Sequence, residues 1–175
     1  MKPEQSEVLF IEGLVSESFK KQNLKNQKIL NIEKLTGDAS TRRYYRIFTN
    51  LNSFVVCLGE PFDKKEKSDF LLTHDLLFQK GVRVPFVYDE NGVKGYILEE
   101  DLGNSTLLSH LSRIACREKE LEIYICAVNE LIKIHEISCL EEKFSLINNR
   151  KFDKDKLFEE FNFTIKFFFK NLIKV

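Results

Sequence analysis

Three short runs rich in β-branched and aromatic residues follow one another between residues 28 and 58, and they constrain the fold more than any other feature. The runs span residues 28–35, 42–49 and 53–58, and short connections that contain residues 37–40 and 50–52 separate them. Both connections hold residues typical of tight turns, and strands joined so closely pair antiparallel. The sequence therefore predicts three antiparallel strands.

A helix is expected on each side of these strands. Apolar residues recur at helical spacing over residues 8–19 and predict an amphipathic helix. Asp63 and Glu66 have the spacing of a capping box, and the apolar face that follows ends at Gly81. We therefore expect a second helix with Asp63 as its N-cap.

Two more strands are predicted at residues 82–88 and 93–99, because the turn signal of residues 89–92 lies between them. Beyond residue 104 the pattern is helical. Residues 121–135 repeat the helical template, and residues 153–172 form another apolar stripe. Phe163, Phe167 and Ile173 make that last helix apolar on nearly every side, which is typical of a helix buried all round.

The composition excludes several classes of protein. With 7 Gly and 3 Pro among 175 residues, the chain has roughly half the usual share of turn formers, which argues against an all-β fold. Lys and Arg number 27, as do Asp and Glu, so no net positive charge favours nucleic acid. No apolar stretch approaches the ~18 residues of a membrane helix, and the N-terminus is polar. We expect a cytoplasmic protein without a nucleic-acid or membrane partner.

The four cysteines contain no CxxC pair, and no histidine stands at zinc-finger spacing from them. We therefore predict no metal site and expect reduced thiols that are mostly buried. The residues concerned are Cys57, Cys116, Cys126 and Cys139.

The connection between the first two strands is a candidate phosphate site. Small residues at 37–40 would let backbone N–H groups approach a phosphate, and the hydroxyl groups of Ser40 and Thr41 can also donate. Arg42, Arg43 and Arg46 follow, and the planar guanidinium group suits phosphate. Strand alternation places Arg42 and Arg46 on one face and Arg43 on the other. A hairpin turn with solvated arginines explains the same residues, so both interpretations stay open.

Four blocks of sequence together resemble the aminoglycoside phosphotransferase-like family. They are GDASTRRYYR at residues 37–46, FVV at 54–56, GVRVP at 81–85 and LEEDLG at 98–103. Within that family the sequence looks most like bacterial cell-wall sugar kinases that phosphorylate N-acetylmuramate and N-acetylglucosamine at the anomeric hydroxyl. The blocks agree in order and spacing over roughly residues 30–110.

The resemblance implies an α+β, protein-kinase-like fold. Residues 1–100 would be a nucleotide-binding N-lobe with a five-stranded antiparallel sheet and one inserted helix. Residues 101–104 would be the hinge, and residues 105–175 the first helices of the C-lobe. An ATP site would lie between the lobes, with a phosphate-covering loop, an apolar ceiling over the base and a hinge that binds adenine. The implied nucleotide-binding residues are Gly37, Asp38, Ala39, Ser40, Thr41, Arg42, Arg46, Val55, Leu98, Glu99, Glu100, Asp101 and Leu102.

Two departures from the kinase pattern matter. Protein kinases place a phosphate-pairing Lys on the third strand, where this sequence has Cys57 and Leu58. Similar sugar kinases also carry an apolar residue there, and we hypothesise that Arg42, Arg43 or Arg46 replaces the Lys. The H-x-D-x-x-x-x-N catalytic loop is also missing, because none of the three histidines has that context.

We therefore predict no catalytic residue in this chain and expect the Mg²⁺ ligands to lie in a missing half. The histidines on apolar stripes, His74 and His135, are expected to be partly buried and satisfied.

The function expected from the resemblance is ATP-dependent phosphorylation of a small-molecule hydroxyl, with an amino sugar as acceptor and Mg²⁺ as cofactor. The chain would then be a truncated kinase that is inactive alone. Two alternatives stay open. One is a nucleotide-binding pseudokinase that docks a partner through Phe163, Phe167 and Ile173, and the other is an unrelated structural protein that dimerises through the same surface.

Overall fold

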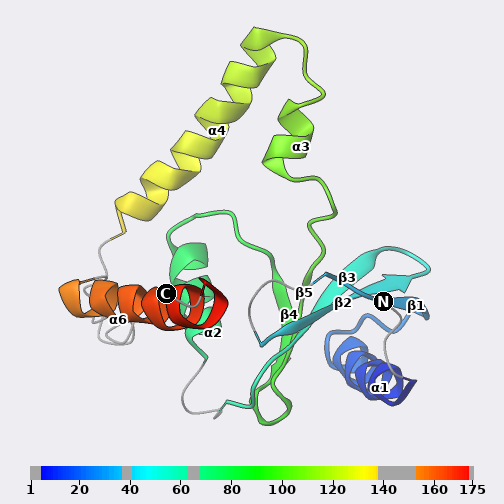
Figure 1. Ribbon diagram of the computed structural model, residues 1–175. Coiled ribbons are helices and arrows are strands. Elements are labelled where there is room, and N and C mark those ends of the chain that lie inside the picture. Colours follow the sequence, from blue (N-terminus) through cyan, green and yellow to red (C-terminus); the bar gives the residue numbers. More distant parts are fainter. Residues whose placement is uncertain (1–4, 37–40, 63–67, 138–152, 174–175) are drawn as a thin grey trace. The chain divides into compact units, whose positions relative to one another are not determined.

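The computed structural model describes residues 5–36, 41–62, 68–137 and 153–173 (Figure 1). By its internal contacts the chain divides into two units, Met1–Glu136 and Ile137–Val175, and each is described by itself. The first unit combines helices with a five-stranded sheet, so the predicted α+β class is confirmed. The predicted hinge at residues 101–104 lies inside this unit and stays a prediction.

All neighbouring strands of the sheet pair antiparallel, in the order β1-β2-β3-β5-β4. The strands are β1 (Ile29–Lys34), β2 (Arg43–Thr49), β3 (Ser53–Leu58), β4 (Val87–Asn91) and β5 (Tyr96–Glu100). The first three strands match their predicted ranges within a residue at each end, because turn chemistry and alternation agree there.

The last two strands lie further along the chain than predicted. The turn between them is the 3₁₀ helix η1 (Gly92–Lys94), where the Lys94 N–H donates to Asn91 Oδ1 at 3.2 Å. Residues 82–86 form no strand. Pro85 has no N–H to donate, and the N–H of Phe86 donates to the Glu100 carboxylate at 3.1 Å instead of to a neighbouring strand.

Helix α1 (Gln5–Lys21) covers one face of the sheet. Its inner residues, Ile11, Leu14, Val15 and Phe19, pack against the alternate side chains of the strands that point to this side. Those strand residues include Tyr45, Ile47, Phe54, Val56, Leu58, Tyr96 and Leu98. The predicted leading helix is confirmed, and it contributes to the larger of the two described cores.

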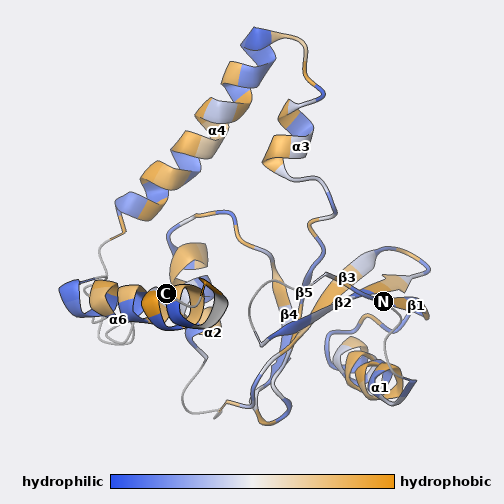
Figure 2. Ribbon diagram, in the orientation of Figure 1, coloured by the Kyte–Doolittle hydropathy of each residue, from blue (hydrophilic) through white to orange (hydrophobic). Residues whose placement is uncertain are grey.

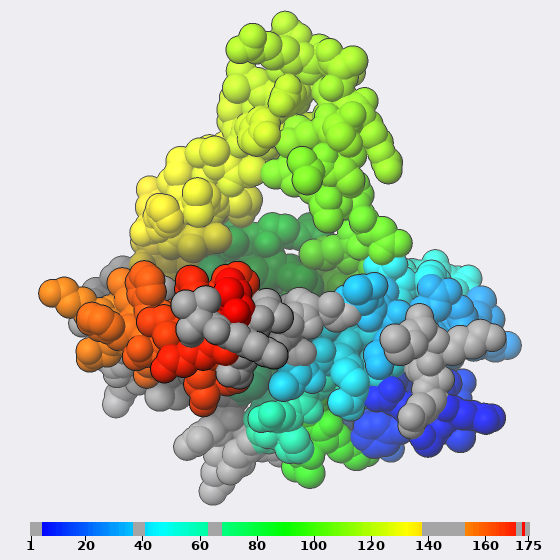
Figure 3. Space-filling view, in the orientation of Figure 1, coloured from blue at the N-terminus to red at the C-terminus, as the bar shows by residue number. Residues whose placement is uncertain are grey.

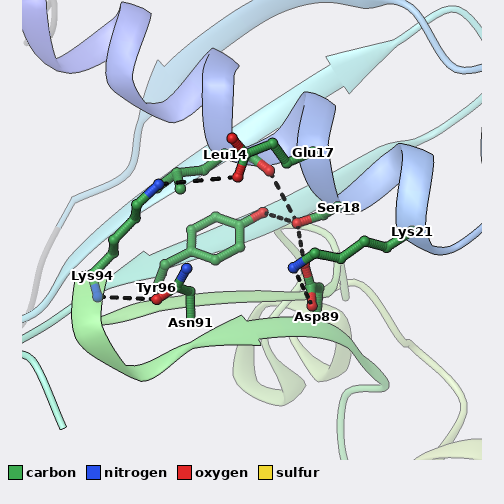
Figure 4. Close-up of polar contacts among 8 residues, drawn as sticks. All are labelled: Leu14, Glu17, Ser18, Lys21, Asp89, Asn91, Lys94 and Tyr96. Carbon is green, nitrogen blue, oxygen red and sulfur yellow. Dashed lines mark hydrogen bonds and ion pairs between the residues drawn. The ribbon is translucent and has the colours of Figure 1, made fainter. Parts of the chain in front are cut away.

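A buried polar cluster lies inside this apolar interface. The hydroxyl of Ser18 on α1 is 2.6 Å from the Asp89 carboxylate on β4 and 3.0 Å from the phenol of Tyr96 on β5 (Figure 4). Lys21, one turn further along α1, forms an ion pair with Asp89 at 3.1 Å. These contacts fix where α1 lies on the sheet.

Helix α2 (Asp69–Gln79) belongs to the opposite face, where Leu71 packs with Cys57 and Ile97. The predicted N-cap was wrong, because the helix begins at Asp69 and the side chain of Ser68 accepts the Leu71 N–H. Serine and aspartate are equally suitable N-cap residues, because the side-chain oxygen of either accepts a hydrogen bond from a free backbone N–H of the first turn. Asp63 and Glu66 lie outside the described residues.

Helices α3 (Leu107–Leu111) and α4 (Arg117–His135) complete the first unit. The helix predicted at residues 121–135 is confirmed, and apolar and polar residues alternate along it (Figure 2). Its apolar stripe is exposed, and Figure 3 shows the side chains of α3 and α4 open on the visible face. His135 is exposed too, which contradicts the expectation of a partly buried side chain.

The second unit contains α6 (Lys154–Thr164), which continues as the π-helix η3 (Ile165–Ile173). The predicted terminal helix is therefore present, but its end has the wider turns of a π-helix. Phe163, Phe167 and Ile173 are exposed, so a helix buried all round is not what the described residues form. In the part of the chain that the structure describes, no helix has the length and apolarity to cross a membrane.

Candidate functional site

Three of the predicted nucleotide-binding residues lie side by side across the sheet. Arg46 on β2 pairs with Val55 on β3, and Val55 pairs with Glu99 on β5. Their sequence neighbours Tyr45, Val56 and Leu98 point into the core under α1. Since side chains alternate along strands, the row Arg46–Val55–Glu99 lies on the face that α2 occupies.

Arg46 forms a buried ion pair with Asp101, which follows β5. The two side chains are 9% and 5% exposed, and Arg46 Nε lies 2.8 Å from Asp101 Oδ2. The Nε–H does not point along this contact, which is therefore electrostatic rather than a hydrogen bond. Arg46 Nη2 makes the directed bond, donating to Asp101 Oδ1 at 2.9 Å. The pair joins the middle of the sheet to the segment after it.

The Asp101 carboxylate has further partners. The Ser53 hydroxyl donates to Oδ2 at 2.6 Å, and the Gly103 N–H donates to Oδ1 at 2.9 Å. Burial alone would raise the pKa of Asp101, but these hydrogen bonds and the charge and hydrogen bond of Arg46 outweigh it, so the pKa is lowered. Asp101 therefore stays ionised at neutral pH.

Arg46 also reaches beyond Asp101. Its Nη1 donates to Asn104 Oδ1 at 2.6 Å, and its Nη2 donates to the carbonyl oxygen of Gly103 at 3.2 Å. We call Arg46, Ser53, Asp101, Gly103 and Asn104 the Arg46 cluster. It ties residues 101–104 to β2 and β3.

Glu99 is a buried carboxylic acid on the same face, with 7% of its surface exposed. Burial raises its pKa to about 7, although the charges of His74 and Arg42 oppose the shift. His74 lies on α2, and its Nε2 is 2.8 Å from the carbonyl oxygen of Pro85, as expected for a satisfied, partly buried histidine. Near neutral pH, Glu99 can therefore hold or release a proton.

The other predicted site residues have different surroundings. The Arg42 guanidinium lies 5.7 Å from the centre of the Phe70 ring on α2, whereas Arg43 forms an ion pair with Glu7 on α1 at 2.9 Å. The predicted division of the arginines between two faces is therefore confirmed. Gly37, Asp38, Ala39 and Ser40 lie outside the described residues.

Around the end of β5 the side chains point in several directions. Leu98 is fully buried under α1, whereas Leu102 is 60% exposed. Thr41, before β2, is also exposed. Glu100 accepts from Arg83 Nη2 at 2.8 Å. Glu99 and Asp101 are buried on the side of Arg46, and Leu98 is buried under α1. A base beside residues 98–102 would therefore be bound by backbone groups.

Sequence reasoning missed Ser53, Gly103 and Asn104 as partners of Arg46 and Asp101. A signal was present, since Asp101, Gly103 and Asn104 form a compact polar turn directly after a strand. No local pattern indicates that this turn contacts a buried arginine.

Two hollows lined by described residues lie away from the Arg46–Val55–Glu99 row. One of about 460 Å³ lies beside Glu100, between the loop of residues 81–86 and α4. One of about 730 Å³ lies between α1 and the loop before β1. The described residues also contain no group of three or more His, Cys, Asp or Glu that could hold a metal.

These observations define a mixed α+β unit with a polar cluster where its sheet ends. No family model matches the chain. It is similar to a curated N-acetylmuramate/N-acetylglucosamine kinase of Neisseria meningitidis serogroup B (strain ATCC BAA-335 / MC58), with 29% identity over 102 residues. The match covers 58% of this chain and 30% of the kinase, so it spans less than a third of that protein. The likeness supports a distant, kinase-like relationship.

Proposed function

We propose that this chain carries the nucleotide-binding part of an ATP-dependent small-molecule phosphotransferase whose acceptor is an amino sugar. The observation that carries the proposal is the similarity to a sugar kinase over 102 residues. The row Arg46–Val55–Glu99 supports it, because it places an apolar side chain between two polar ones, beside the segment that follows β5.

In this proposal Val55 forms the apolar ceiling over the adenine base. The backbone of residues 98–102 supplies hydrogen bonds to the edge of the adenine base. Residues 37–41 would cover the phosphates, with Arg42 beside them. Preorganised hydrogen-bond donors and positive charges stabilise the negative charge of phosphoryl groups.

The proposal assigns no catalytic residue and no Mg²⁺ ligand to this chain. Metal-bound phosphates need carboxylate ligands near the γ-phosphate, and the described residues contain no group of three or more His, Cys, Asp or Glu that could hold a metal. The general base and the metal ligands would come from outside these 175 residues.

A thermal melt with and without Mg-ATP tests the proposal, with Mg-tripolyphosphate as the control for simple anion binding. Nucleotide at about 100 times its Kd stabilises a folded chain by roughly 2.7 kcal/mol, which raises Tm by several degrees. A rise with ATP and none with tripolyphosphate is expected. An unchanged Tm at millimolar ATP would contradict the proposal.

Two adjacent valines provide a matched pair of variants. Val55 points to the proposed site, whereas Val56 is fully buried under α1. Both Val→Ala changes remove the same two methyl groups and lower stability. We expect Val55→Ala alone to weaken ATP binding, by about fivefold, since roughly 1 kcal/mol of apolar contact is lost. Equal ATP affinity in the two variants would remove Val55 from the site.

No observation favours the pseudokinase or the unrelated structural protein over the kinase-like proposal. Docking or self-association through Phe163, Phe167 and Ile173 stays a prediction. Sedimentation velocity over a range of concentrations tests self-association, with Phe163→Ser and Phe167→Ser combined as the variant that should abolish it.

A further inference from the structure

We infer that Arg46 is a positioning residue, which holds the backbone of residues 101–104 in the conformation that receives the base, and that it does not bind phosphate. This inference rests on the proposed nucleotide site and specifies the role of one of its residues. It replaces the hypothesis that Arg46 substitutes for the missing lysine of β3.

The guanidinium group of Arg46 is fully used by contacts within the protein. Arg46 Nη1 donates to Asn104, Nη2 donates to both Asp101 and Gly103, and Nε contacts Asp101. Arginine has five N–H donors in a fixed plane, and here all three nitrogens face the same short segment. With 9% of the side chain exposed, little of the group is accessible to a phosphate.

The charge of Arg46 is balanced by a buried carboxylate. The Asp101 carboxylate lies against Arg46 and is 5% exposed, and its lowered pKa keeps it charged. A phosphate approaching Arg46 would meet this negative charge in a poorly solvated environment, where repulsion is strong. The positive charge of Arg46 is therefore already neutralised.

The segment that Arg46 contacts has a specific backbone geometry. Gly103 has a φ of 81°, in the left-handed region that glycine favours. Its N–H donates to Asp101 and its carbonyl oxygen accepts from Arg46, so both polar groups of this residue are fixed. Because Leu102 directly precedes it, the direction of the Leu102 carbonyl depends on the same contacts.

Ser53 links the cluster to β3, the strand that carries Val55. Its hydroxyl donates to Asp101 at 2.6 Å, two residues before Val55 along the strand. The proposed ceiling of the site and the proposed hinge are thus held in register by one carboxylate. A change at Arg46 or Ser53 should alter how the base is held and leave the phosphates unaffected.

The binding test compares three ligands: Mg-ATP, adenosine and Mg-tripolyphosphate. The first variant is Arg46→Lys, which keeps the positive charge but loses the planar set of guanidinium N–H donors. The second is Ser53→Ala, a milder change that removes one hydrogen bond to Asp101. For Arg46→Lys we expect the affinities for ATP and adenosine to fall by the same factor, about tenfold, as follows from losing a charged hydrogen bond. Ser53→Ala should act in the same direction with a smaller factor.

Ser18→Ala serves as the control for general destabilisation, because Ser18 lies on the other face of the sheet. Ser18→Ala should lower Tm and leave the affinities for ATP and adenosine unchanged. A weaker affinity for ATP with an unchanged affinity for adenosine in Arg46→Lys would identify a phosphate ligand and overturn the inference. Unchanged affinity for both ligands would overturn it as well.

Hydrogen exchange separates this inference from the proposed function. The Gly103 amide, which donates to Asp101, should be protected in the free wild-type chain and should exchange at least tenfold faster in Arg46→Lys. In Ser18→Ala its rate should stay near that of the wild type. If the wild type binds no nucleotide, the proposed function fails and with it the role of Arg46 in holding a base. Equal Gly103 exchange in Arg46→Lys and wild type would refute the positioning role even if ATP binds.

Discussion

The phenol of Tyr96 on β5 lies 3.0 Å from the hydroxyl of Ser18 on α1, inside an otherwise apolar interface. Ser18 is also 2.6 Å from the Asp89 carboxylate (Figure 4). A serine hydroxyl has one hydrogen, and both the Asp89 carboxylate and the Leu14 carbonyl oxygen, at 3.0 Å, can accept it. Both of these partners are acceptors only, so the Ser18 oxygen accepts from Tyr96. Burial raises the pKa of Tyr96, which keeps the phenol protonated as the donor. The helix and the sheet are thus joined by a chain of hydrogen bonds.

Ser18→Ala should destabilise the protein by about 1–3 kcal/mol, because it leaves the buried phenol of Tyr96 without its acceptor. Urea unfolding followed by circular dichroism measures the change. The control is Ser16→Ala, since Ser16 is on the same helix but exposed. Similar midpoints for the two variants would show that the buried cluster does not stabilise α1 on the sheet.

Two glycines should respond in opposite directions to alanine. Gly13 is exposed inside α1, and a Cβ there would meet nothing within 4 Å, so Gly13→Ala should stabilise by about 0.5–1 kcal/mol. Gly95 has a φ of 59°, and a Cβ there would overlap the carbonyl of Gly59. Gly95→Ala should lower Tm by several degrees. Thermal melts of both variants check the pair, and a stabilised Gly95→Ala would contradict the turn geometry.

The described cysteines should differ in reactivity. Cys57 is 3% exposed, and burial raises the pKa of its thiol, whereas Cys126 on α4 is exposed. Since the thiolate is the reactive form, iodoacetamide should label Cys126 in the native protein and Cys57 only after unfolding. Peptide mass spectrometry measures both sites, with the protein in denaturant as the control. Equal native rates would place Cys57 at the surface.

These thiols also show what the sequence did not reveal. We expected mostly buried cysteines, yet Cys116 and Cys126 are exposed, and Cys139 lies outside the described residues. Residue type favours burial, but it does not say which face of a helix has a neighbour. The apolar stripe of α4 was predicted correctly as a pattern, and the described residues leave it exposed.

The strands were more predictable than the site. Alternation and turn residues act locally, so β1, β2 and β3 could be placed from the sequence alone. The partnership of Arg46 with Asp101 joins residues 55 positions apart, and no local pattern encodes it. Sequence analysis could place Arg46 on the correct face of the sheet, but it could not show that the Asp101 carboxylate neutralises its charge.

Glu99 should make stability depend on pH. Burial raises its pKa from the ordinary 4.5 to about 7, so between these values the unfolded chain releases a proton that the folded chain keeps. The stabilisation is complete below about pH 4.5 and is lost as pH rises through about 7, a total of roughly 3 kcal/mol. Asp101 acts in the opposite sense at lower pH, because its pKa is lowered and its stabilisation is lost on acidification.

Glu99→Gln keeps the shape of the side chain and removes its titration. We measure the free energy of unfolding of this variant and of the wild type in urea from pH 4.5 to 8. The difference, variant minus wild type, should increase by about 3 kcal/mol as the pH rises, because only the wild type loses the stabilisation from Glu99. His74 and Arg42, whose charges act on Glu99, are unchanged in the variant. Glu90→Gln, at an exposed position on β4, serves as the control and should follow the wild type. Parallel profiles for Glu99→Gln and wild type would mean that Glu99 ionises near its ordinary pKa, and that the face of the sheet beside Val55 is better hydrated than its burial indicates.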